Sequence, residues 1–197
     1  MSRMLVEDGT RGERPQVREQ TWLIDHDIIV FASSEALTNK KFFDVKRRPA
    51  YQSQVWPPSK GRKYYWRYLQ VSHNIQIGTH TVTTQQTFEN FSSIEIKLGD
   101  TTYPRIPISV LLPYSIAQQG TSLLLKDNLN SWFKLPEPIL VEEQSTPEVT
   151  FIPQEGLTAS ASAPALPWSG QNPAANDTGW WIRLTAYGVL DRPARAK

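Results

Sequence analysis

The sequence of 197 residues contains no cysteine and only three histidines. Without cysteine the chain can form no disulfide, no thiol nucleophile, no iron–sulfur cluster and no cysteine-ligated zinc site. It also has no apolar run of about 18 residues, so no transmembrane helix is predicted. A Walker loop, a glycine-rich dinucleotide turn and a Gly-x-Ser-x-Gly nucleophile motif are missing as well. These absences remove most of the enzyme classes that a short motif would identify.

The histidines are not arranged as metal ligands usually are. Asp25, His26 and Asp27 are consecutive, and neighbouring residues of a strand point to opposite faces, so we do not expect them to bind one ion. His73 and His80 are seven residues apart, which would place them on opposite faces of one continuous strand. We therefore predict no metal ion and no other cofactor, and we do not expect an enzyme.

Alternation of apolar and polar residues is the clearest pattern, and it predicts β-strands. Within Tyr64–Ile77 the odd positions from Leu69 onward are apolar and the even positions are polar, with His73 on the apolar side. A period of two places one face of the strand in a core and the other in water. Shorter strands are predicted over 22–24, 28–31, 132–135, 139–141, 148–152 and 180–190.

A β-hairpin is predicted between residues 93 and 112. Apolar residues alternate over 93–98 and again over 103–112, and a turn with Gly99 lies between the two runs. Because Pro104 and Pro107 cannot donate to a ladder, we expect the return strand to lie at a sheet edge or to be interrupted.

The pattern as a whole predicts one all-β domain with the strand spacing of a sandwich or barrel. Residues 115–129 are the only stretch with a helical appearance, and a glycine breaks it. Residues 1–20 have no periodicity and are predicted to form a flexible N-terminal arm ahead of the domain at 21–197. Within the domain, 157–179 is predicted to be one long loop.

Positive charge is concentrated between residues 40 and 63, which hold eight cations and one acid, Asp44. Aromatic residues lie within and beside this basic block, and cations interleaved with aromatics are typical of surfaces that bind nucleic acid. The same composition suits an anionic lipid surface. The alternative is a solvated loop whose aromatic rings pack inward. The residues of this predicted nucleic-acid-facing or membrane-facing patch are Lys40, Lys41, Lys46, Arg47, Arg48, Lys60, Arg62 and Lys63.

Negative charge is concentrated in a second segment, 137–155, which holds five acids and no cation. A basic and an acidic patch on one chain of small net charge are suited to complementary contacts between copies of that chain. We therefore expect the protein to associate with itself.

The order of several segments is similar to that of a known family. These segments are IQIG at 75–78, IEIKLGD at 94–100, PISVLLP at 107–113, FKLPEPI at 133–139 and WIRLTAYGVLDRP at 181–193. Together they resemble the single jelly-roll capsid proteins of tailless icosahedral bacteriophages, especially those with an internal membrane. The resemblance covers about residues 22–193.

The resemblance implies a fold and a role. The fold would be a single jelly-roll sandwich of two facing antiparallel four-stranded sheets. The role would be that of a structural protein in the capsid shell of the virion, with no catalysis, cofactor or small-molecule substrate. Its partners would be other copies of itself and other capsid proteins, and the basic block would face the genome or the membrane beneath the shell.

Two other functions stay open from the sequence. A β-sandwich module of the phage-spike type could bind glycans or a receptor through exposed aromatic residues such as Trp168 and Trp181. An enzyme on a cupin-like jelly roll would need clustered His and Glu ligands, which the number and spacing of the histidines do not provide.

Overall fold

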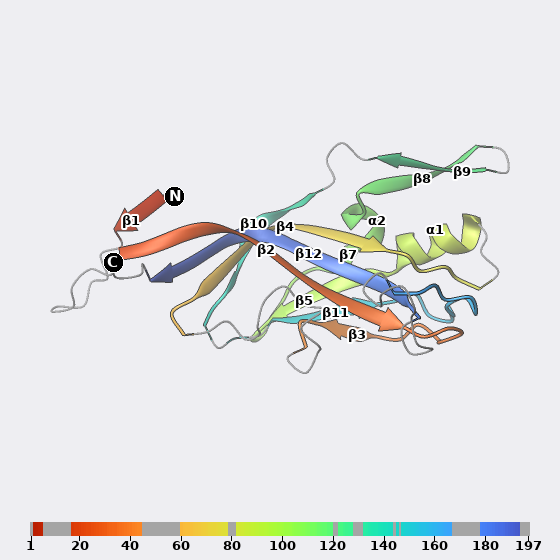
Figure 1. The fold of residues 1–197 in the computed structure, drawn as a ribbon, viewed down its shortest axis with the longest axis horizontal. Helices are drawn as coiled ribbons and strands as arrows, with labels where there is room; N and C mark the ends of the chain where they lie inside the picture. Colours follow the sequence, from red (N-terminus) through yellow and green to blue (C-terminus); the bar gives the residue numbers. More distant parts are fainter. Residues whose placement is uncertain are drawn as a thin grey trace.

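Two antiparallel sheets face one another and form most of the molecule (Figure 1). The computed structural model describes residues 2–5, 17–44, 60–78, 82–119, 122–127, 132–143, 145, 147–166 and 178–193. The buried side chains of the two sheets belong to a single apolar core. The predicted all-β architecture with two antiparallel sheets is therefore confirmed. The expectation of four strands in each sheet is wrong for the larger one, which has five because Ser2–Leu5 adds a strand beside Val17–Gln20.

The larger sheet has five strands in the order β1-β2-β12-β4-β10. Strands β2 and β12 pair along the whole length of β12, from Phe31 opposite Trp180 to Arg18 opposite Pro193. In Figure 1 this ladder runs lengthwise through the sandwich. The bounds are Ser2–Leu5 for β1, Val17–Phe31 for β2, Lys63–His73 for β4, Phe133–Val141 for β10 and Trp180–Pro193 for β12.

The smaller sheet has four strands in the order β3-β11-β5-β6, and a fifth short strand, β7, also pairs with β5. Strands β6 and β7 are two residues long, and the short helix α2 follows β7 directly. The predicted return strand is thus interrupted, as its prolines indicated. The bounds are Lys40–Phe42 for β3, Ser93–Leu98 for β5, Thr101–Thr102 for β6, Ile106–Pro107 for β7, Ile108–Leu111 for α2 and Glu148–Ile152 for β11.

The strands pair in a nested order along the chain. Strand β2 pairs with β12, β3 with β11, β4 with β10, and β5 with β6 and β7. The chain is therefore an antiparallel ribbon in which early strands pair with late ones. Two further pairings, β12 with β4 and β11 with β5, wind this ribbon into the two sheets.

The core is built from the inward-facing side chains of both sheets. Phe31 of β2 contacts Phe151 of β11 edge to face, with ring centroids 5.8 Å apart. Phe43 contacts Trp66 of β4, with centroids 5.2 Å apart. All four side chains are fully buried. Burying an aromatic side chain stabilises the fold by roughly 1.5–3 kcal/mol, so these contacts across the core hold the two sheets together.

A β-bulge at Arg67 explains where the alternation of β4 begins. Tyr187 lies opposite Tyr68 while Gly188 lies opposite Trp66, so Arg67 is an extra residue in β4. The buried positions of β4 are therefore even before the bulge and odd after it, which is why the sequence alternates regularly only from Leu69 onward.

Helix α1 (Val82–Phe91) packs at one end of the sandwich and was not predicted. Its sequence contains Val82 and three threonines, and β-branched residues have low helix propensity. Packing stabilises it instead, because the fully buried Phe88 lies against the ring of Phe151 at a centroid distance of 6.3 Å.

The helical appearance of residues 115–129 was misleading. The structure has a two-stranded antiparallel hairpin there, formed by β8 (Tyr114–Gln119) and β9 (Ser122–Asp127). The Gly that broke the helical pattern, Gly120, lies in the sequence between the two strands. A glycine between two short runs favours a turn over a continuous helix.

The predicted arm of residues 1–20 includes β1 and the first four residues of β2. Strand β1 pairs with Val17–Gln20 of the same chain, and Arg18–Gln20 also pair with the end of β12. The described part of the arm therefore has strand geometry, while its flexibility stays a prediction.

The start of the predicted long loop at 157–179 is held between two other segments. Thr158 pairs with Ala36 and Ala159 with Ile77 in isolated bridges. The indole Nε1 of Trp180 donates to the carbonyl oxygen of Ser160 at 2.8 Å. The described part of the loop is therefore fixed against the sandwich.

Candidate functional site

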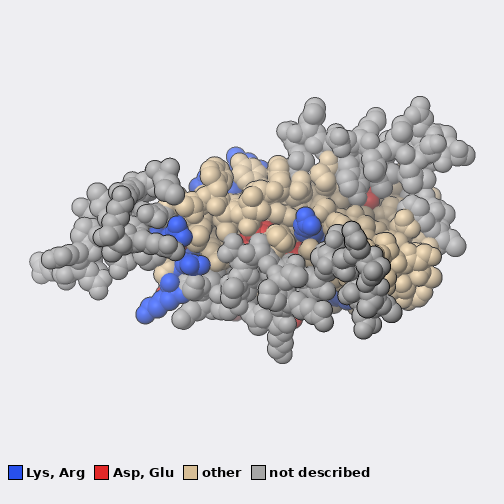
Figure 2. Space-filling model, in the orientation of Figure 1, with Lys and Arg blue, Asp and Glu red and all other residues tan. Residues whose placement is uncertain are grey.

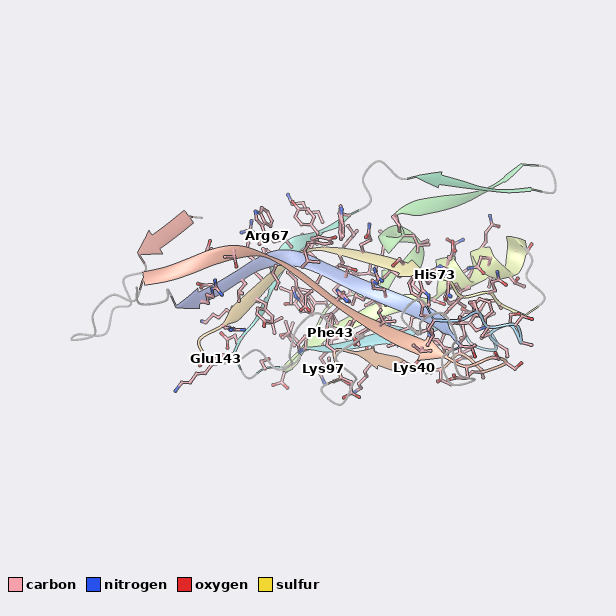
Figure 3. The ribbon with its side chains drawn as sticks, viewed as in Figure 1. Lys40, Phe43, Arg67, His73, Lys97 and Glu143 are labelled. Carbon is pink, nitrogen blue, oxygen red and sulfur yellow. The ribbon has the colours of Figure 1, made fainter. Side chains whose placement is uncertain are left out.

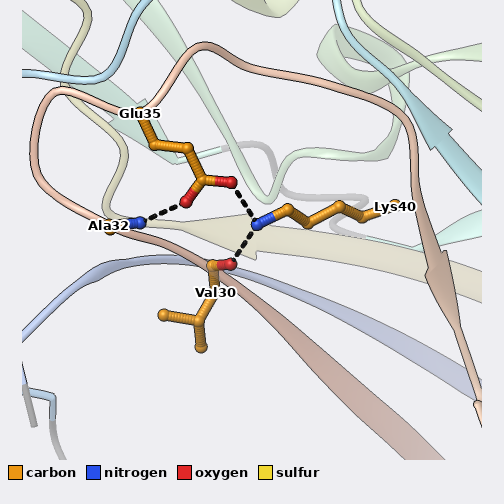
Figure 4. Close-up of polar contacts among 4 residues, drawn as sticks. All are labelled: Val30, Ala32, Glu35 and Lys40. Carbon is orange, nitrogen blue, oxygen red and sulfur yellow. Dashed lines mark hydrogen bonds and ion pairs between the residues drawn. The ribbon is translucent and has the colours of Figure 1, made fainter. Parts of the chain in front are cut away.

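Lys40, the first residue of β3, contacts both the end of β2 and the connection between β2 and β3 (Figure 4). Its Nζ lies 2.7 Å from Oε1 of Glu35 and donates to the carbonyl oxygen of Val30 at 2.6 Å. The same ammonium group lies 4.0 Å from the ring centroid of Phe31. Glu35 in turn accepts from the backbone N–H of Ala32 at 2.5 Å. The charge of Lys40 is therefore already neutralised within the chain.

Lys41 forms an ion pair with Glu148 of the neighbouring strand β11. The hydrogen bond from the Lys41 ammonium holds the pKa of Glu148 below its usual range. Both side chains are exposed, so water screens the pair and its contribution to stability is small. Like Lys40, Lys41 has a carboxylate partner in its own chain.

The other described cations of the basic block lie at the start of β4. Lys60 is exposed, and the backbone N–H of Gly61 donates to Oε2 of Glu143. The side chain of Arg62 hydrogen-bonds that of Tyr64. Burial and the nearby Asp25 carboxylate nevertheless raise the pKa of Tyr64 above its ordinary value.

The structure does not bring the described residues of the basic block together on one sheet. Lys40 and Lys41 belong to β3 of the smaller sheet, whereas Lys63 belongs to β4 of the larger sheet. Glu143 and Glu148 of the acidic segment both contact the basic block of the same chain. Association between copies through these two segments stays a prediction. Three predicted residues lie outside the described residues: Lys46, Arg47 and Arg48.

A buried polar cluster joins β4 to α1, and it was not predicted. Nε2 of His73 lies 3.3 Å from Oε1 of Glu89, and the same oxygen accepts from Nε2 of Gln85 at 3.2 Å. The ring of His73 contacts Phe88 edge to face, with centroids 5.1 Å apart. The sequence placed His73 on the apolar side of its strand, and its side chain is indeed buried. The missed signal was the spacing of Gln85 and Glu89, which puts both on one helix face.

Asp25 and Asp27 point into the core, and His26 points to the opposite side of the sheet, as the alternation predicted. Oδ1 of Asp27 accepts from the backbone N–H of Ile28 at 2.8 Å, and Oδ2 accepts from that of Phe43. Phe43 has a φ of 57°, so Asp27 holds an uncommon backbone conformation in place.

His26 lies on the outer face of the larger sheet, where burial and the charge of Arg183 lower its pKa. In the described ranges, no three His, Asp or Glu side chains are placed to hold a metal ion. His80 lies outside those ranges.

None of the helices in the described part of the chain is long and apolar enough to cross a membrane. No family model matches the sequence, and a search of curated proteins finds no relative. What can be said of function therefore depends on the strand order and on the surfaces of this chain.

Proposed function

We propose that the chain is a structural virion protein, a capsid subunit of a tailless icosahedral bacteriophage with a single jelly-roll fold. The nested strand pairing is the observation that carries this proposal. A jelly roll is a two-sheet sandwich of eight strands that contains two Greek keys. The pairs β2·β12, β3·β11, β4·β10 and β5·β6, distributed over two sheets, support this proposal.

The ladder between β2 and β12 supports the role of a building block. It pairs residues near the two ends of the chain along all of β12, and the same strands contribute to the core shared with the smaller sheet. A shell subunit must keep its shape while its neighbours contact it on several sides. A continuous ladder over a single core provides such a body.

Exposed apolar side chains at the helical end supply a surface for lateral contacts. Phe91 at the end of α1 is 67% exposed, and Val110 in α2 is 50% exposed. The two helices contact each other, and exposed apolar side chains on neighbouring elements are suited to an interaction surface. A stable contact between subunits buries about 1,200–2,000 Å² in total, and such residues would lie within it. The partners are further copies of this chain and other capsid proteins.

Size-exclusion chromatography with light scattering over a range of ionic strength tests this proposal. We expect multimers whose size depends on salt. A monomer of 22.4 kDa under all conditions would contradict the proposal. Glycan binding by that monomer, abolished by Trp181→Ala, would instead support the glycan-binding module. Trp181 is half-buried beside the Arg183 guanidinium, and Trp168 lies outside the described residues.

A further inference from the structure

The outer faces of the two sheets carry different kinds of side chain. The outward side of the smaller sheet carries two ion pairs: Lys41 contacts Glu148, and Nε of Arg105, which precedes β7, lies 2.9 Å from Oε2 of Glu95. Lys97 lies opposite Glu148 in the ladder. The charges of these two ion pairs are balanced within the chain.

The outer face of the larger sheet is aromatic. Trp22 and Ile24 of β2 are 78% and 54% exposed, although they belong to a central ladder. Trp22 lies opposite Val189, which lies opposite Tyr65. The next row is formed by Ile24, Tyr187, Tyr68 and Lys134. Four adjacent strands therefore present two rows of mostly apolar side chains to the outside.

Cations lie beside these rows. Arg67, the bulge residue of β4, is exposed above the sheet, whereas Phe43 and Lys97 lie below it (Figure 3). Lys134 is exposed at the edge strand, and Arg183 lies 5.6 Å from the ring centroid of Trp181. Among the residues that the structure describes, none of these three cations has a carboxylate within ion-pair distance. Figure 2 shows blue side chains at the upper edge of the described surface, above β10 and β4.

The carboxylates of the same sheet are mostly turned away. Asp25 and Asp27 point into the core and are fully buried. Asp191 is 7% exposed and lies opposite Lys63 in the ladder. Among the carboxylates of this sheet whose side chains the structure describes, Glu137 is exposed, and it lies in the edge strand β10. The face is therefore aromatic and positively charged, which makes it complementary to an anion with flat apolar groups.

We propose that the outer face of the larger sheet binds single-stranded nucleic acid. Every base has a flat face that can stack on an exposed ring such as Trp22, whatever the sequence. Phosphates would lie against Arg67, Lys134 and Arg183, whose charges no described carboxylate balances. A sheet surface with aromatic side chains is also one on which unpaired bases can spread. The proposed nucleic-acid contact therefore lies on the outer face of the larger sheet and not on the basic block, where the sequence predicted it.

The affinity of the whole protein for a fluorescent oligothymidine, measured by anisotropy between about 50 and 200 mM salt, tests this inference. We expect Trp22→Ala to weaken binding about tenfold, the loss of one stacked base. The double variant Arg67→Ala with Lys134→Ala should weaken binding and lower the log–log salt slope by about 0.7 per lost phosphate contact.

Two exposed residues off this face serve as matched controls. Phe91→Ala removes an exposed aromatic ring from α1, and Lys97→Ala removes an exposed cation from the smaller sheet. Because Phe91 also belongs to the proposed subunit contact, the affinities are compared at a dilution where light scattering shows monomers, and there both variants should leave the affinity for oligothymidine unchanged. Equal losses of affinity in Trp22→Ala and Phe91→Ala would overturn the inference. Equal losses of affinity in Lys97→Ala and in the double variant of Arg67 and Lys134 would do the same. So would the absence of oligothymidine binding at low salt.

Competing ligands separate this partner from two others. Vesicles containing phosphatidylglycerol and an acidic polysaccharide, polygalacturonate, are measured with the same variants. Trp22-dependent binding to either of these, without Trp22-dependent binding to oligothymidine, would contradict the inference. This inference does not depend on the proposed role in a capsid shell. If the protein assembles but does not bind oligothymidine, this inference alone is overturned.

Discussion

Nε2 of His73 and Oε1 of Glu89 lie 3.3 Å apart in the interior, and this contact joins the larger sheet to helix α1. Both side chains are almost fully buried, and Gln85 donates to the same carboxylate oxygen. A buried carboxylate is stabilised only while its hydrogen-bond partners stay in place. The packing of α1 on the sandwich therefore depends on a polar contact as well as on Phe88.

Replacing Glu89 should destabilise the protein strongly. Glu89→Ala leaves the polar groups of His73 and Gln85 buried without their acceptor, and we expect a loss of about 3 kcal/mol or more in the free energy of unfolding. Glu89→Gln keeps a side-chain oxygen at the site and should cost less. Urea unfolding measures both. Asn90→Ala, on the exposed side of the same helix, is the control and should change stability by about 0.5 kcal/mol or less. Similar losses for Glu89→Ala and Asn90→Ala would contradict this assignment.

Gly188 should not tolerate a side chain. A Cβ at this position would lie 1.6 Å from the carbonyl oxygen of Tyr65, because β12 approaches the backbone of β4 closely beside the bulge. We expect Gly188→Ala to destabilise the fold by about 3 kcal/mol, the upper end of the usual cost of overpacking. At Gly99, where φ is +54° and a Cβ would meet nothing within 4 Å, alanine should cost about 1–2 kcal/mol. Thermal unfolding that ranks the two variants the other way would contradict the close approach.

His26 should make stability fall as the pH is lowered. Burial, and then the charge of Arg183, lower its pKa in the folded state, so the unfolded chain takes up a proton first. This contribution is fully present above the ordinary histidine pKa of about 6.5 and decreases as the pH falls toward the folded-state value. His26→Gln should therefore lose less stability than the wild type between about pH 7.5 and pH 5.5. An NMR titration in which the His26 midpoint lies at or above the ordinary value would refute this prediction.

Removal of residues 1–16 should leave a folded protein that assembles poorly. The deletion removes β1 but keeps β2 from Val17, so the ladder with β12 is retained. Circular dichroism and urea unfolding should then resemble those of the full chain, whereas light scattering should show fewer multimers. Assembly equal to that of the full chain would show that the arm has no role in it.

Period-two alternation made most of the strands predictable, since a half-buried strand must alternate its side chains. The interruption around Pro104 and Pro107 was also predictable, because proline cannot donate to a ladder. Helix α1 could not be predicted in this way, since Phe88 is held by contacts with residues distant in sequence. The β-bulge at Arg67 likewise depends on the register with β12.

The candidate site was less predictable than the fold. Composition identified the cations of the basic block, but it could not show that Lys41 is paired with Glu148, which is 107 residues away in sequence. Composition could not predict the aromatic outer face either. Trp22, Tyr187 and Tyr68 come from three strands that only the register of the sheet places side by side.

Electron microscopy of the purified protein at increasing concentration tests the central claim most directly. A shell subunit with this fold should form closed particles or regular arrays of repeating units. Dispersed single molecules at every concentration and salt tested would contradict the proposed role in a capsid.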